Sequence, residues 1–164
     1  MLRWFMDSAE LQLEPTRKSV ELTERNVLLI LHIAAAIMFI GPVTVATSMF
    51  PRFTTPETLP VAREFYRVSR AYGFGSLAVI ALGLILAQRT EMLGQGWVNA
   101  SLAIFIGAYG LLLGFIVPRQ RRVLGTLEAG SEVTPADLAP LRATSGIFGL
   151  AWVVILYLMV AKPF

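Results

Sequence analysis

The stretch NVLLILHIAAAIMFIGPVTVATSMF, Asn26–Phe50, runs for 25 residues without a charged side chain. Three more uncharged stretches follow at 71–88, 92–118 and 143–161. A helix of about 20 apolar residues crosses the hydrocarbon core of a bilayer. Each stretch is therefore predicted to be a membrane-spanning helix. The predicted fold class is all-α, with residues 26–164 forming one four-helix transmembrane bundle.

The composition is typical of a membrane protein and excludes several kinds of site and partner. Of the 164 residues 55% are hydrophobic, and the mean hydropathy is +0.65, which is too high for a soluble domain with a polar surface. The absence of cysteine excludes disulfides and thiolate metal sites within the chain. A net charge of +3, placed at the ends of loops, suits lipid phosphates rather than nucleic acid. The bias toward arginine over lysine is typical of GC-rich bacterial genomes, so a bacterial plasma membrane is expected.

Residues 1–25 precede the first span and do not resemble a signal peptide. Acidic residues begin at Asp7, where a signal peptide would continue with an apolar segment. Trp4 and Phe5 are typical anchors at a membrane interface. The segment is predicted to lie at the interface, and a frayed tail is the alternative.

The distribution of positive charge predicts the topology. Segments 51–70 and 119–142 together carry eight arginines, against six basic residues on the opposite side. Because cytoplasmic loops are enriched in Arg and Lys, both termini are predicted to be extracytoplasmic. Thr55-Pro56 and Thr134-Pro135 are typical helix starts, so each segment is predicted to contain a helical lead-in to the next span. The likeness of these two starts suggests two parallel helical-hairpin repeats, with independent capping as the alternative.

Small residues recur at helical spacing within the spans. Gly75 and Gly83 lie in the second span, Ala103 precedes Gly107 by four residues in the third, and a Gly110–Gly114 pair follows there. Apolar side chains gain nothing by leaving lipid for another helix, so membrane helices associate through close contacts at small residues. These positions are therefore predicted to be packing faces.

His32, the one histidine, lies about two turns inside the first span. Ionisable groups within the membrane are costly and are often functional. The imidazole could be an axial haem ligand or handle protons, or it could be neutral and form a hydrogen bond with another helix. The spans contain no Asp or Glu. No catalytic or metal-binding residue is predicted, and an enzyme is not expected.

Arg63, Arg67 and Arg70 follow one another at i, i+4 and i+7 and form a single cationic stripe on a helix. Such a stripe can contact anionic lipid, a phosphate or the acidic surface of a partner. Ordinary anchoring of the chain at the membrane surface is the alternative. The second arginine group predicted to contact lipid or a partner is Arg119, Arg121 and Arg122.

Short motifs at both ends of the bundle carry a family resemblance. Leu31–Ala36 with Phe39-Ile40-Gly41, and the ending Leu158–Pro163, resemble a family of predicted four-helix bacterial integral membrane proteins of unknown function. The first span is also similar to copper-resistance D-type proteins and to membrane protoporphyrinogen oxidases. That second resemblance implies a functional histidine at His32.

The expected function is that of an accessory or assembly subunit of a larger bacterial membrane complex, for which a respiratory complex is one candidate. Its partners would be membrane lipids and other membrane subunits, or further copies of the chain. The first alternative is a small haem-, quinone- or copper-handling redox protein centred on His32. The second is a transporter of lipid or small molecules. No resident cofactor is expected in the accessory role, whereas the redox alternative implies haem.

Overall fold

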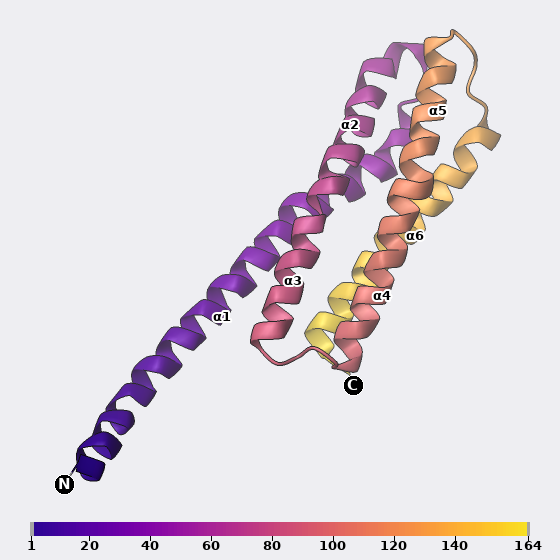
Figure 1. Cartoon of the computed structure of the whole chain (residues 1–164). Helices are drawn as coiled ribbons and strands as arrows, with labels where there is room; N and C mark the ends of the chain where they lie inside the picture. The colour runs from indigo at the N-terminus through magenta and orange to yellow at the C-terminus, as the bar shows by residue number, and fades with distance from the viewer. Residues whose placement is uncertain (1, 164) are drawn as a thin grey trace.

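A computed structural model describes the backbone of residues 2–163 and the side chains of residues 18–163. This part of the chain consists of helices joined by short turns and contains no strand (Figure 1). The elements are α1 (Leu2–Met49), the 3₁₀ turns η1 (Phe50–Arg52) and η2 (Pro56–Thr58), α2 (Leu59–Gly75), α3 (Leu77–Arg89), α4 (Gly96–Leu111), the π-helical segment η3 (Leu112–Ile116), α5 (Val117–Glu128) and α6 (Pro135–Ala161).

Four helical stretches of the described residues are long and apolar enough to cross a membrane. They are Lys18–Arg52, Pro56–Arg89, Gly96–Glu128 and Pro135–Ala161. The second combines α2 with α3, and the third combines α4, η3 and α5. The predicted all-α four-helix bundle is confirmed, and the chain is a multi-pass membrane protein by the length and composition of its helices.

The ends of the helices divide the bundle into two poles. The turns from α1 to α2 and from α5 to α6 lie at one pole, which is uppermost in Figure 1. The turn from α3 to α4, the end of α6 and the start of α1 lie toward the other pole. An even number of crossings, here four, places the start of α1 and the end of α6 on the same side of a membrane. The prediction that both ends are extracytoplasmic remains a prediction.

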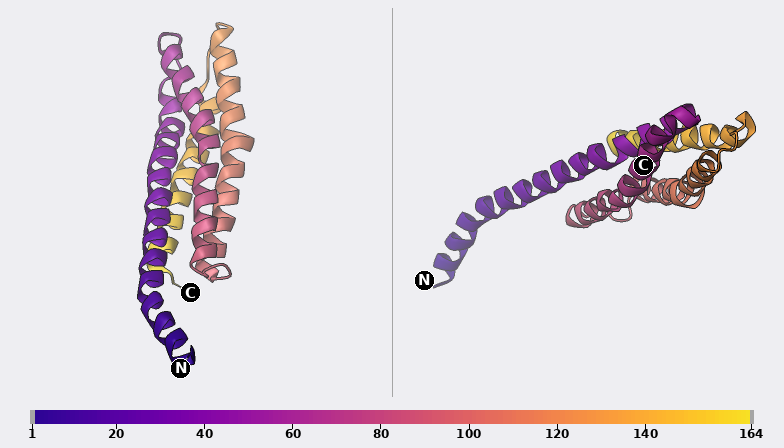
Figure 2. Two further views of the ribbon diagram at one scale, coloured as in Figure 1. Left: turned by 60° about the vertical axis from the view of Figure 1, so that its left-hand side comes forward. Right: turned by 90° about the horizontal axis from the view of Figure 1, so that it is seen from above.

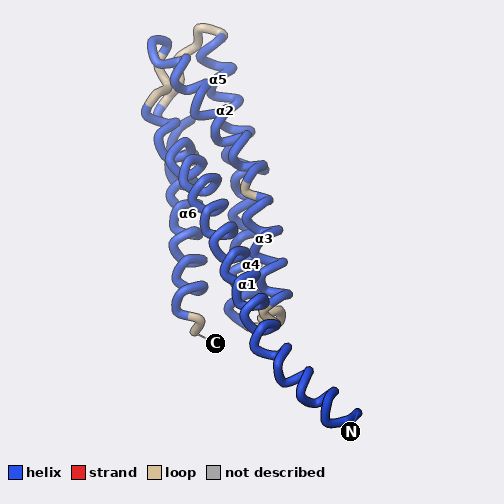
Figure 3. Tube along the Cα trace, turned by 90° about the vertical axis from the view of Figure 1, so that its left-hand side faces the viewer, coloured by secondary structure: helices blue, strands red, loops and turns tan. Residues whose placement is uncertain are grey.

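Helix α1 is longer than the bundle, and its first half projects beyond the other helices (Figures 2 and 3). Residues 2–25, predicted to be an interfacial segment, are the first turns of this continuous helix. The side chains of Trp4 and Phe5 lie outside the described residues. The position of this segment relative to a membrane surface therefore remains a prediction.

The two arginine-rich segments contain more helix than the sequence predicted. The helical lead-ins are confirmed, since α2 begins at Leu59 and α6 at Pro135. However, residues 119–128 were predicted as part of a loop, whereas α5 carries the third span on to Glu128. Arginines end an uncharged stretch, but they are good helix formers and do not end a helix.

The buried core lies mainly in the half of the bundle that includes α2 and α5. Phe50, Leu112, Ile116 and Phe148 are almost fully buried there. Ser145 Oγ donates a hydrogen bond to the Thr47 carbonyl oxygen at 2.9 Å, which ties α6 to α1. The first and fourth predicted spans thus meet through a polar contact as well as through apolar packing.

Helix α6 starts at a capping box. Thr134 Oγ1 accepts a hydrogen bond from the Asp137 N–H, and the Asp137 carboxylate accepts one from the Thr134 N–H. A comparable pair, Thr55 and Thr58, begins a 3₁₀ turn before α2 instead of an α-helix. Capping explains both Thr-Pro starts, and the proposed hairpin duplication remains a prediction.

Candidate functional site

His32 joins α1 to α3. Its Nδ1 lies 2.9 Å from the Val79 carbonyl oxygen. A carbonyl oxygen only accepts, so Nδ1 carries the proton and donates. Gly83 makes room for the ring, because a Cβ atom at that position would lie 2.8 Å from His32 Cε1. This contact is the hydrogen bond to a neighbouring helix that was one of the two predictions for His32.

The surroundings of His32 are those of a packing contact. With Nδ1 engaged, only Nε2 could ligate an iron atom, and the ring already rests against Gly83. Among residues 18–163 no three His, Cys, Asp or Glu side chains come together as a metal site. Cofactor binding at His32 remains a prediction.

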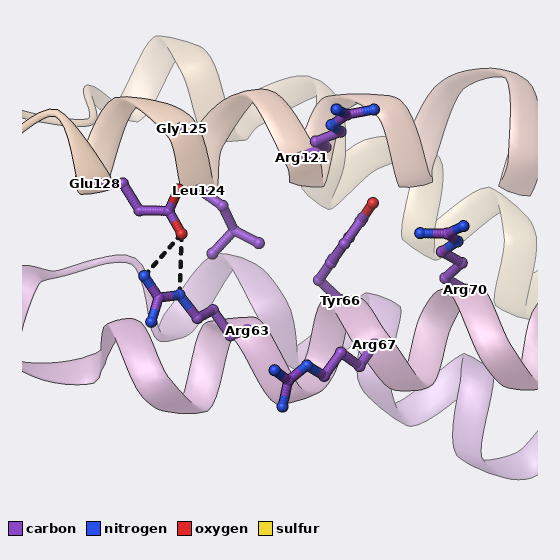
Figure 4. Close-up of a pocket in the computed structure, with 8 residues that line it drawn as sticks. All are labelled: Arg63, Tyr66, Arg67, Arg70, Arg121, Leu124, Gly125 and Glu128. Carbon is purple, nitrogen blue, oxygen red and sulfur yellow. Dashed lines mark hydrogen bonds and ion pairs between the residues drawn. The ribbon is translucent and has the colours of Figure 1, made fainter.

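The arginine groups meet in a groove between α2 and α5. Two adjoining cavities, of about 430 and 620 Å³, share Tyr66, Arg70 and Arg121 in their walls. We call them together the arginine groove. In Figure 4, Tyr66 and Arg70 rise from α2 on the side facing α5. Behind the groove the two helices are joined by buried side chains, since Gln120 Nε2 donates to Ser69 Oγ at 3.3 Å.

The lining of the arginine groove changes from charged to apolar along its length. This is because α2 and α5 run antiparallel, so that the charged parts of the two helices lie at the same end. At the end farther from the uncharged spans, Arg63 forms an ion pair with Glu128, with 2.9 Å between Nη2 and Oε1 (Figure 4). Cationic side chains line its middle. The end nearest the uncharged spans is lined by Phe74, Leu113 and Val117. Charged side chains and an apolar wall therefore follow one another along the length of the groove.

The arginines of the groove differ in how far they are neutralised. Arg63 pairs with Glu128, and Arg67 pairs with Glu64 on its own helix. Within residues 18–163 no such ion pair involves the groove arginines Arg70, Arg121 and Arg122. The middle of the groove consequently carries uncompensated positive charge.

The structure unites most of the arginines predicted to contact lipid or partners. Arg63, Arg67 and Arg70 from one segment and Arg121 and Arg122 from the other all line the arginine groove. Arg119 does not line it, and its guanidinium carbon lies 5.0 Å from the centre of the Phe115 ring. A cation over an aromatic ring is itself a favourable contact.

Sequence reasoning missed the groove because it missed α5. Gly125 and Glu128 belong to the walls but were not singled out. A signal was available in the spacing of Val117, Arg121 and Leu124, which recurs every three to four residues as on one face of a helix. Extending this period past Pro118 would have predicted a second wall.

The small residues of α4 and η3 form a second surface, which faces outward and is not covered by another described helix. No atom of the described residues beyond the immediate helix lies within 4 Å of a Cβ placed on Gly107, Gly110 or Gly114. By contrast, Gly73 meets Leu112 and Gly75 meets Phe39. We call Ala103, Gly107, Gly110 and Gly114 the open glycine face.

Comparison with known proteins found no family model, no curated protein and no solved structure that matches this chain. The resemblances drawn from the short motifs therefore remain predictions.

Proposed function

We propose that this chain is a non-catalytic accessory or assembly subunit of a larger complex in a bacterial plasma membrane, with both ends extracytoplasmic. The open glycine face is the observation that carries the proposal. Membrane helices use small residues to bring backbones together. Gly73, Gly75 and Gly83 serve that purpose inside the bundle, each against a side chain of another helix or segment. Among the described residues, Gly107, Gly110 and Gly114 of the open glycine face have no such neighbour.

The use of polar groups within the spans supports a binding role over chemistry. His32 donates to Val79, and Ser145 donates to the carbonyl of Thr47. Thr44 Oγ1 donates to the Ile40 carbonyl of its own helix at 2.8 Å. The first two contacts hold helices together, the third stays within α1, and all three leave few groups for catalysis. No observation favours the redox or transport alternatives over the accessory role.

Co-purification from native membranes tests the proposal. The variant Gly110→Leu/Gly114→Leu should retain its fold, because both positions are open, yet it should lose a co-purifying membrane subunit. Gly146→Leu on α6 is the matched control, since that position is equally open but lies outside the open glycine face. It should retain the subunit. A wild-type chain that purifies only with copies of itself would contradict the accessory role.

A further inference from the structure

We propose that the arginine groove binds one anionic phospholipid. Its phosphate lies between Arg70 and Arg121, and an acyl chain follows the apolar wall formed by Phe74, Leu113 and Val117. This ligand class follows from the contacts of α2 and α5. It does not depend on the accessory role proposed above.

Charge is the first argument for an anionic headgroup. Arg70 and Arg121 both line the two cavities of the groove, on facing helices. Neither belongs to an ion pair among the described residues, whereas Arg63 and Arg67 are already paired. The planar guanidinium group matches phosphate oxygens in bidentate hydrogen bonds. Basic pockets between membrane helices are typical sites for anionic headgroups.

Depth is the second argument. Arg70 immediately precedes the uncharged stretch 71–88, and Arg121 follows 92–118 by three residues. Both side chains therefore start where a span meets the headgroup region. The Tyr66 ring stands beside them in the groove (Figure 4). A tyrosine at this level is typical of membrane interfaces, since it has an apolar body and a polar tip.

The shape of the groove distinguishes a lipid from a soluble phosphate. The Arg63–Glu128 pair neutralises the end of the groove that is farther from the uncharged spans. Toward the spans the lining becomes apolar, at Phe74, Leu113 and Val117. Inorganic phosphate would leave this wall uncovered. A phospholipid would cover it with an acyl chain and place its phosphate among the cations.

Native mass spectrometry of the detergent-solubilised full chain, titrated with phosphatidylglycerol or phosphatidylcholine, tests the site. Phosphatidylglycerol should bind with one tight site and phosphatidylcholine should not. Arg70→Gln/Arg121→Gln should weaken phosphatidylglycerol binding roughly 25-fold, because each cation near an anionic headgroup contributes roughly a factor of five. Arg52→Gln/Arg142→Gln removes the same charge from the same pole outside the groove, and it should have little effect. Equal weakening by both pairs would reduce the site to general surface charge.

Two further measurements test the lipid site without changing the charge of the protein. Gly125→Leu would project a side chain into the groove without clash, because a Cβ there meets nothing within 4 Å. It should weaken phosphatidylglycerol binding while the net charge stays the same, and unchanged binding would overturn the proposed position. Glycerol 3-phosphate in millimolar excess should not displace the lipid. Full displacement would overturn the acyl-chain contact and leave a soluble phosphate site.

Discussion

At the residue scale, the presence of His32 in a span predicted a hydrogen bond or a ligand contact, but it did not predict the partner. A lone histidine in a span signals a special contact, but the sequence cannot tell which of the other helices reaches it. The partner is a backbone carbonyl, that of Val79. Carbonyls carry no sequence signal, so the hydrogen bond was predictable in kind and its acceptor was not.

Replacing His32 by Leu should lower the free energy of unfolding by about 1 kcal/mol, the usual value of one hydrogen bond between membrane helices. His32→Gln keeps a donor and should recover part of the loss. Reversible unfolding in mixed detergent micelles measures both. The contrary result is a coloured wild-type preparation whose haem absorption disappears in His32→Leu, since it would assign the residue to a cofactor.

The glycines give a matched comparison at the same scale. An alanine at Gly83 would place its Cβ 2.8 Å from His32 Cε1 and would push the ring off Val79. An alanine at Gly107 would meet no atom of the described neighbouring residues within 4 Å. Gly83→Ala should cost about 1–2 kcal/mol, whereas Gly107→Ala should be neutral or slightly stabilising in the isolated chain. Equal effects of the two substitutions on the unfolding midpoint would contradict the assigned packing.

At the element scale, the uncharged stretches located the spans well and located the helix ends poorly. The third span was predicted to end at 118, yet its helix continues to Glu128. The extension is amphipathic, with Val123, Leu124 and Leu127 buried. A criterion based on absence of charge cannot detect such a helix. Arginines of both walls of the arginine groove were therefore predicted, whereas the helix that brings the second group to face the first was not.

The start of α6 carries a prediction at this scale. Thr134→Ala removes the side-chain oxygen that accepts from the Asp137 N–H, so it should lower stability by about 1 kcal/mol. Thr134→Ser keeps the cap and should behave as wild type. Thermal unfolding followed by circular dichroism separates the two. The capping assignment fails if Thr134→Ala and Thr134→Ser unfold at the same temperature.

At the scale of the whole molecule, the sequence predicted the class of fold because lipid imposes it. A chain in hydrocarbon must satisfy its backbone hydrogen bonds within each segment, so four long uncharged stretches leave helices as the natural solution. The mutual arrangement of the helices was not predictable. It depends on which small residue meets which side chain, such as Gly75 with Phe39.

Topology is readily measured because the chain has no cysteine. Single substitutions Ser131→Cys and Gln95→Cys place thiols in exposed turns at opposite poles of the bundle. A membrane-impermeant maleimide added to intact spheroplasts should label Gln95→Cys and should leave Ser131→Cys unlabelled until the membrane is broken. The reverse pattern would invert the predicted orientation, and labelling of both in intact spheroplasts would contradict the four crossings.

Photo-crosslinking in living cells tests the accessory role most directly. Ile106 lies beside the open glycine face and is 61% exposed, while Ile147 on α6 is 60% exposed. A benzophenone amino acid at 106 should yield one discrete adduct with a different membrane protein, and at 147 it should yield lipid adducts alone. Lipid adducts alone at both positions, or an adduct at 106 with a second copy of this chain, would contradict the proposed function.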